Sequence, residues 1–348
     1  MDFSKEAYNT IQRDTSGADP LISVYIPCHN GEKYISDCLN SIISQDYSNL
    51  EILVVDNASD DSTAQIISKY VEKDIRVKYI KCNKLGVAEA RNYAVEKCLG
   101  SWIAAVDSDD CVTPDYISKM YDAAKTAKAD FVVASYCKAD TKRKRITKYK
   151  DSCIDDKEEM HRFFLTDALH NNSAWGKLYK ADVIKKMQYP VGKLYEDMAV
   201  IPYVLEQTER MAVISDVVYI YNNNPQSLSR SIFSISDGDS AVKGQFDGLY
   251  FRMANSDLYK EKYPKLYAVA LDAVLDFSFF LLGKVYVLKK DKKHKQYALK
   301  LEKEICDAID KSILQASKGS FKLKSAVSLY KISKTLAEML FYFYSQKH

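Results

Sequence analysis

The chain has 348 residues, of which 47% are hydrophobic and 28% are charged, and its formal net charge is +3. This length predicts two or three domains, and the composition is that of a folded protein rather than a disordered one. The small net charge gives no support for a nucleic acid as partner. The 8 cysteines include no Cys-x-x-Cys pair, which argues against zinc ribbons and redox dithiols and favours free thiols in a reducing compartment.

The chain is expected to carry neither a secretory signal nor a membrane span. Its first residues, 1–6, lack the apolar segment of a signal peptide. No run of ~18 uncharged apolar residues occurs. The longest apolar stretch, 267–287, contains Asp272, Asp276 and Lys284 and is interpreted as a buried helix. A cytoplasmic location follows as an expectation, with peripheral contact to the inner face of the membrane left open.

Between residues 21 and 135, short β-branched runs alternate with segments of helical periodicity. Strands are predicted at 21–27, 51–55, 76–80, 101–106 and 131–135. Helices are predicted between them at 32–45, 60–70, 87–97 and onwards from Thr113, where a cap residue, a proline and an acid follow one another. This alternation with short loops predicts an α/β fold with a doubly wound, mostly parallel sheet.

Beyond residue 135 the pattern is less regular. The basic, turn-rich segment 138–150 is expected to form an exposed hairpin or a flexible loop. Helices are predicted at 155–169 and 195–207, and a strand is predicted at 213–221. From about residue 231 to the end, helical periodicity continues with almost no strand pattern. We therefore place a boundary near 234–237, between an α/β domain over 1–234 and an all-helical domain over 235–348.

Three aspartates, Asp107, Asp109 and Asp110, directly follow the predicted strand 101–106. The carboxyl ends of parallel strands form the edge at which open α/β sheets bind ligands. Carboxylates suit Mg²⁺ or Mn²⁺, and these ions in turn suit a diphosphate. The cluster indicates either a metal-dependent enzyme that acts on a nucleotide-linked substrate or an acidic turn that caps the next helix.

Five segments at the ends of predicted elements share their order and spacing with a known family. They are PCHNGE at 27–32, VDNAS at 55–59, NKLGVAEARN at 83–92, VDSDD at 106–110 and YED at 195–197. Together they closely resemble the family 2 glycosyltransferases of the GT-A fold, over roughly residues 20–230. The resemblance implies a Rossmann-like region that binds the nucleotide sugar at about 20–135 and an acceptor side at about 136–234.

The resemblance implies an inverting enzyme that moves a hexose from a UDP-sugar to a hydroxyl of a bacterial surface polysaccharide intermediate or a glycoprotein glycan. Such a displacement needs a cation at the leaving diphosphate and a base for the acceptor's proton. Asp109 matches the family's metal-binding aspartate, with Mn²⁺ or Mg²⁺ as the ion, and Asp107 matches the position near ribose and metal. Asp197 matches the base, which a helix N-terminus should keep ionised. Asp110 either ligates the ion through water or caps the helix at Thr113, which is the interpretation we favour.

On the nucleotide side, the resemblance implies that Asp56 or Asn57 accepts the N3–H of uracil. Thymine offers the same donor and cytosine does not, so UDP is favoured and dTDP remains open. His29 is expected to stack on the base, or else to fix Asn30 as a loop histidine. The other residues expected at the nucleotide sugar are Pro27, Asn30, Glu32, Gly86, Arg91, Asp107 and Ser108.

Arg91 is expected to pair with Asp107 or with the diphosphate, because a guanidinium offers bidentate geometry. The alternative is a solvated arginine on a helix. Glu32 either reaches the base or caps its own helix. Gly86 permits a close approach of the backbone to the ligand.

On the acceptor side, Trp175 is either a platform beneath the acceptor sugar or a core residue. Glu196 either faces the acceptor or joins Asp197 in capping a helix N-terminus. His161 and His170 are weaker candidates for additional metal ligands.

Two other functions remain open at this point. One is a catalytically weak, glycosyltransferase-like partner subunit, and the other is a sugar-nucleotide pyrophosphorylase, whose Gly-rich basic loop is missing after the first strand. The helical tail is basic at 289–295 and amphipathic at 321–344. We expect its apolar face to pack on the chain itself or in a homodimer, ahead of membrane docking or binding of a protein acceptor.

Overall fold

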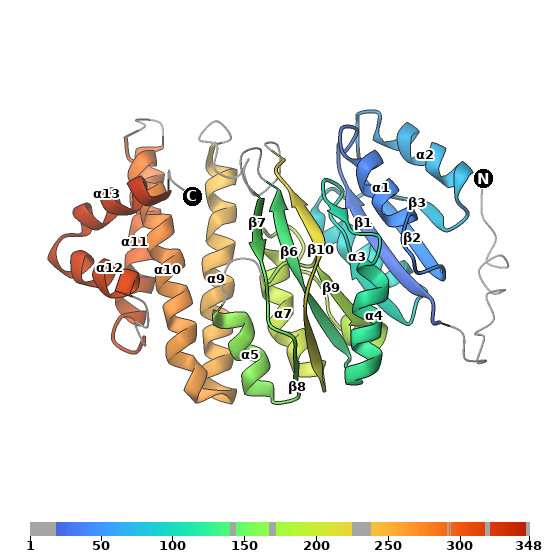
Figure 1. Cartoon of the computed structure of the whole chain (residues 1–348). Coiled ribbons are helices and arrows are strands. Elements are labelled where there is room, and N and C mark those ends of the chain that lie inside the picture. The colour runs from blue at the N-terminus through green and yellow to red at the C-terminus, as the bar shows by residue number, and fades with distance from the viewer. Residues whose placement is uncertain are drawn as a thin grey trace.

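The structure is a computed structural model that describes residues 19–139, 144–166, 172–224, 238–290, 292, 294–316 and 321–345. Within these residues, a single mixed sheet lies between two layers of helices. Helices of the C-terminal part stand against the outer side of one of these layers (Figure 1). The predicted boundary at 234–237 lies outside the described residues.

One half of the sheet is parallel, as the sequence predicts. Its strands follow the order β3-β2-β1-β4 and comprise β1 (Ile22–Cys28), β2 (Leu50–Asn57), β3 (Val77–Cys82) and β4 (Trp102–Ala105). Every residue of β1 and β2 is buried, as expected for parallel strands that helices cover on both faces. The parallel pairing places the carboxyl ends of these strands at one edge.

The other half of the sheet departs from the expected parallel arrangement. It contains β9 (Lys177–Lys180), β6 (Phe131–Ala139), β10 (Met211–Asn222), β5 (Cys111–Val112), β7 (Lys144–Thr147) and β8 (Ser152–Ile154). Strand β9 runs antiparallel to both β4 and β6, while β10 runs parallel to β6. Strands β6 and β7 form the hairpin expected around the basic segment. The doubly wound sheet is therefore confirmed, and it is a mixed sheet in which antiparallel strands are added to the parallel ones.

Helices cover both faces of the sheet. Along β1, Val24 and Ile26 contribute to the core of one face and Tyr25 to the core of the other, as the period of a strand dictates. The first face is covered by α1 (Ile35–Ile43), α2 (Thr63–Lys73) and α4 (Tyr116–Ala127). The second is covered by α3 (Val87–Lys97), α5 (Lys157–Thr166), α6 (Ala181–Ile184) and α7 (Glu196–Gln207).

The C-terminal part is helical, as predicted, and has a core of its own. It comprises α9 (Gly238–Lys262), α10 (Pro264–Leu288), α11 (Lys295–Ser312), α12 (Phe321–Ile332) and α13 (Lys334–Ser345). By length and composition α10 could cross a membrane, yet 61% of its apolar window is buried inside the structure, in agreement with its interpretation as a buried helix. Helices α9 and α10 pack against α7 and α5, which joins this part to the second helical layer (Figure 1).

Candidate functional site

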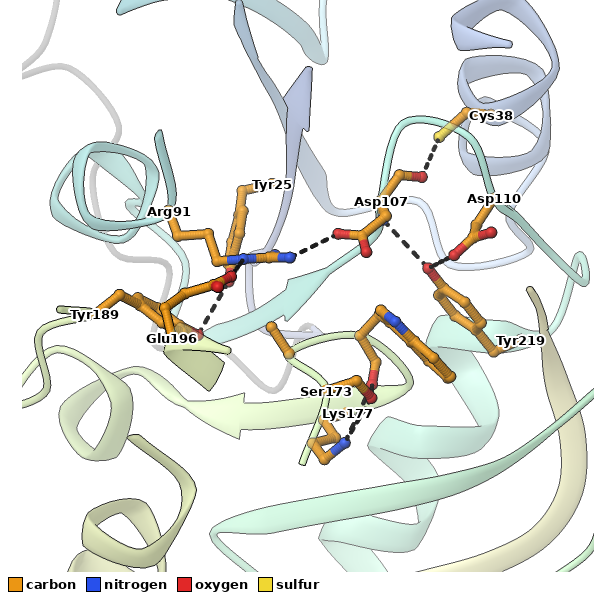
Figure 2. A network of polar contacts seen from close by, with 12 residues as sticks. Tyr25, Cys38, Arg91, Asp107, Asp110, Ser173, Lys177, Tyr189, Glu196 and Tyr219 are labelled. Atoms are coloured by element: carbon orange, nitrogen blue, oxygen red, sulfur yellow. Dashed lines mark hydrogen bonds and ion pairs between the residues drawn. The ribbon is translucent and has the colours of Figure 1, made fainter. Parts of the chain in front are cut away.

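The predicted site residues gather where the carboxyl ends of β1, β2 and β4 meet the helices α3 and α7. Asp107, Asp109 and Asp110 follow β4, Arg91 lies in the second turn of α3, and Glu196 is the first residue of α7. A network of polar contacts joins these elements (Figure 2).

Arg91 is the centre of this network. It is 4% exposed; its Nη2 lies 2.9 Å from Asp107 Oδ1 and its Nε lies 3.1 Å from Glu196 Oε1 (Figure 2). Burial lowers the pKa of Arg91, whereas the nearby Asp107, Tyr25 and Glu196 raise it. The second effect is the larger, so the pKa of Arg91 lies well above its ordinary value. The predicted pairing with Asp107 is thus confirmed, and the solvated arginine is excluded. Glu196 bonds to Arg91 rather than capping α7 with Asp197.

Asp110 does not cap the following helix, so the interpretation that we favoured from the sequence is wrong. Its carboxylate is 1% exposed and accepts hydrogen bonds of 2.7 Å from the Tyr219 hydroxyl and the Asn222 N–H, both on β10. The Tyr219 hydroxyl in turn accepts the N–H of Asp107 at 3.2 Å (Figure 2). Asp110 therefore anchors the loop of residues 107–110, called the aspartate loop below, to β10.

Asp109 is partly exposed and has one oxygen engaged, since Oδ2 accepts a 2.9 Å hydrogen bond from Asn224 Nδ2. Burial and the nearby Asp107 carboxylate raise the pKa of Asp109. Two crowded carboxylates at a sheet edge fit a divalent cation, which would relieve their repulsion. Among the described residues no group of three or more His, Cys, Asp or Glu side chains is arranged to hold a metal. The protein would thus supply two carboxylates, leaving the other positions to phosphate and water, as is usual for Mg²⁺.

The two histidines weighed as extra ligands do not join this group. His161 is fully buried between α5 and α9, with Nε2 3.0 Å from Glu206 Oε1 and Nδ1 3.3 Å from the Tyr259 hydroxyl. Burial lowers the pKa of His161. His170 lies outside the described residues.

Asp197 is half-buried at the start of α7, where its Oδ1 accepts the N–H of Met198 at 2.8 Å. Burial, followed by the adjacent Glu196 carboxylate, raises the pKa of Asp197 to about 7, although Arg91 and Lys177 act in the opposite direction. The sequence predicts a carboxylate that the helix N-terminus keeps ionised, and the structure shows that burial outweighs that effect. A carboxylate that titrates near neutral pH is well suited to general-base catalysis.

The loop after β1 is tied to the loop after β2. The exposed His29 places Nδ1 2.8 Å from the carbonyl oxygen of Asn57, so it fixes β2 rather than Asn30. Asn30 instead accepts the N–H of Asp60 at 2.9 Å through its side-chain oxygen. Glu32 accepts the N–H of Ser62, the residue before α2, at 3.2 Å, so it binds the loop after β2 and does not cap its own helix. Pro27 is the second-to-last residue of β1, and Ser108 lies between Asp107 and Asp109 in the loop after β4.

Asp56 and Asn57 are buried and already engaged. The two oxygens of Asp56 accept hydrogen bonds from Ser59 N–H at 3.0 Å and from the Tyr79 hydroxyl at 2.7 Å. Asn57 Oδ1 accepts the N–H of Gly86 at 2.7 Å. Gly86 has a φ of 144°, a backbone conformation that residues with a side chain rarely adopt, so another residue there would be strained. These residues shape the loops of the site, and uracil recognition by Asp56 or Asn57 stays a prediction.

Trp175 is a core residue rather than a platform beneath the acceptor sugar. It is 7% exposed and stacks on Tyr219 with ring centroids 4.5 Å apart and an interplanar angle of 11°. It belongs to the core behind the aspartate loop rather than to an open platform. Sequence reasoning missed Tyr219, Asn222 and Asn224, because the alternation at 213–221 predicts a strand without indicating which loop that strand contacts.

The comparisons with known proteins agree with this geometry. Residues 23–188 match the family model described as Glycosyl transferase family 2. The glycosyltransferases GlyA and GlyG of Streptococcus pneumoniae serotype 4 are 31% identical over 221 residues and 30% identical over 227 residues, respectively. These matches cover 61% and 62% of this chain; the chain spans 32% of GlyA and 75% of GlyG.

Among solved structures, residues 1–349 of Staphylococcus aureus TarS match with a TM-score of 0.64 at 19% identity, over 94% of this chain and 92% of that chain. A second crystal structure of the same TarS segment, in complex with UDP-GlcNAc, matches with a TM-score of 0.63. At this identity the likeness shows that the two chains share a fold.

Proposed function

We propose, from the premise that this chain belongs to glycosyl transferase family 2, that it moves a hexose from a UDP-sugar to a hydroxyl of a glycan acceptor with inversion at the anomeric carbon. The acceptor in this proposal is a surface polysaccharide intermediate or a glycoprotein glycan. TarS, a protein of the same fold, has been crystallised in complex with UDP-GlcNAc, and this supports a UDP-linked donor.

The observation that carries the proposal is the pair of contacts made by Arg91. One guanidinium binds Asp107 on the loop proposed for the donor and Glu196, the neighbour of the proposed base. Residues that are far apart in the chain therefore meet in one network. Asp107 lies on the side proposed to bind the diphosphate, and Glu196 lies on the side of the proposed base.

In the proposed reaction Asp197 accepts the proton of the acceptor hydroxyl while that oxygen attacks the anomeric carbon and the bond to UDP breaks on the opposite face. Arg91 holds Asp107 in place and keeps Glu196 from repelling the substrate. A Mn²⁺ or Mg²⁺ ion held by Asp107 and Asp109 would neutralise charge on the leaving diphosphate.

The first test replaces the proposed base. Asp197→Asn removes the proton acceptor with little change of shape, so transfer should fall by about 10²- to 10⁴-fold, the usual contribution of a general base. Calorimetric affinity for UDP should stay within about twofold. Glu209→Gln, which changes an exposed carboxylate just beyond the other end of α7, is the control. A full rate for Asp197→Asn would show that the base is another group.

The donor and the metal are tested together. Purified protein is supplied with a panel of UDP-sugars and Mn²⁺, with and without EDTA, and released UDP is measured. Turnover of one UDP-sugar that EDTA abolishes, and that Asp109→Ala abolishes as well, is the expected result. Turnover that survives EDTA would remove the metal from the proposal, and turnover of a GDP-sugar alone would remove UDP.

A further inference from the structure

We infer that the C-terminal helix α9 positions the base-bearing segment 193–198, which makes Asp247, Gly248 and Asn255 positioning residues for the transfer reaction. The inference rests on the proposed role of Asp197. It assigns to the helical part of the chain a task in the reaction, beyond packing against the α/β domain. Three separate contacts along α9 carry it.

The first contact fixes the chain just before α7. Asp247, which is 7% exposed, places Oδ1 2.8 Å from Lys193 Nζ and accepts the N–H of Leu194 through Oδ2 at 3.2 Å. The bond to the half-exposed lysine is a weak contribution on its own. The bond from a backbone N–H to a buried carboxylate is charge-assisted and directional, so it fixes where the chain enters the next turn.

The second contact supports Tyr195, which adopts the left-handed backbone conformation with φ 60° directly before Glu196. Such a conformation costs a residue with a side chain about 1–2 kcal/mol, so its surroundings have to hold it. The Tyr195 ring packs edge-on against Phe277 of α10, with centroids 5.6 Å apart. A Cβ at position 248 would lie 2.9 Å from both rings, so Gly248 leaves the space that Tyr195 occupies.

The third contact lies one residue after the base. Pro202 sits inside α7 and has no N–H, so the helix cannot supply the usual i+4 donor to the carbonyl of Met198. Asn255 Nδ2 donates to that carbonyl at 3.2 Å. Helix α9 thus replaces a hydrogen bond that α7 lacks. Arg252, one turn earlier on α9, contacts Met198 Sδ and lies 4.3 Å from the centre of the Phe277 ring.

The same helix contributes to the charge around Asp197. The charged and titratable groups whose fields act on this carboxylate are Glu196 on its own helix, Arg91 on α3, Lys177 and Tyr179 on β9, and Arg252 on α9. Burial lowers the pKa of Arg252 to about 10, so this side chain remains a cation at neutral pH. Both the position and the surroundings of Asp197 therefore depend on α9.

The test uses the full chain with Asp247→Ala, Gly248→Ala and Asn255→Leu. A displaced base should lower kcat by about 10- to 100-fold, while the donor KM and the affinity for UDP stay within twofold. Asp257→Ala, an exposed aspartate on the same helix, is the control for Asp247→Ala and should match the wild type. Alanine is more favourable than glycine in a helix interior by about 1 kcal/mol. If Gly248 affected only the stability of α9, Gly248→Ala would therefore leave kcat unchanged.

The outcomes separate this inference from the proposed function. Wild-type kcat in Gly248→Ala and Asn255→Leu, beside an inactive Asp197→Asn, would overturn the positioning role and leave the base in place. A full rate in Asp197→Asn would instead overturn the base. Parallel losses of kcat, UDP affinity and melting temperature in all three variants would show a merely structural contact and would also overturn the inference.

Discussion

At the scale of the residue, the adjacent acids Glu196 and Asp197 have different surroundings. Arg91 binds Glu196 directly, whereas for Asp197 burial and the repulsion of its neighbour outweigh the opposing effects of Arg91, Lys177 and the Met198 N–H on its pKa. Paired carboxylates in unequal surroundings are a common arrangement for assigning acid and base roles. The family pattern at 195–197 predicts the identity of the base but not this division, because the division depends on a guanidinium about a hundred positions earlier in the chain.

The rate of transfer should follow the titration of Asp197. Burial and Glu196 raise the pKa of Asp197 to about 7, and a base works only when it is deprotonated. We therefore expect kcat to be constant above that pH and to fall about tenfold per unit below it. Glu196→Gln removes the neighbouring like charge and should move the midpoint to lower pH, as measured by single-turnover rates from pH 5.5 to 8.5. A flat profile, or a midpoint that Glu196→Gln leaves in place, would contradict this.

At the scale of the element, the parallel strands were predictable because helices cover both of their faces, which makes each strand a continuous apolar run. Strand β9 was not predictable, since it is four residues long and has lysine at each end. The sequence-based assignment of Asp110 as a helix cap was wrong for a related reason. Its hydrogen-bond partners, Tyr219 and Asn222, lie on β10, more than a hundred residues later in the chain. Local spacing carries no information about a pairing over such a separation.

The contact between α7 and α9 predicts an energetic coupling between Pro202 and Asn255. Asn255→Leu should destabilise the protein by about 1–3 kcal/mol, because the carbonyl of Met198 loses its donor. Pro202→Ala restores a helical N–H for that carbonyl, so in this background Asn255→Leu should cost about 0.5–1.5 kcal/mol less. Urea unfolding of the four proteins measures the cycle. Additivity within about 0.3 kcal/mol would mean that the two sites do not share this carbonyl.

At the scale of the whole molecule, the α/β and helical parts have separate cores yet share buried polar contacts. Asn255 binds Met198, and His161 of α5 lies against Tyr259 of α9. The sequence predicts two parts with a boundary between them. It does not predict that they are joined at the helix that carries the base, because the contacts of α9 come from a polar helix with no clear amphipathic pattern.

We expect the two parts to unfold together. The chain has 2 tryptophans, Trp102 and Trp175, and both lie in the α/β domain, so their fluorescence reports on that domain alone. Circular dichroism at 222 nm reports mainly on helices, many of which lie in the C-terminal part. Coincident thermal transitions by the two probes are the expected result. Loss of helix before any change in fluorescence would show that the two parts are independent.

The dependence of α7 on Asn255 also concerns the order in which a ribosome makes the chain. The donor-side loops and Asp197 are synthesised first, and the side chain that completes α7 emerges only with α9. A nascent chain thus holds every residue proposed to bind the sugar nucleotide before its base is fixed in place. We therefore expect the chain to become catalytically competent only after α9 has left the exit tunnel of the ribosome.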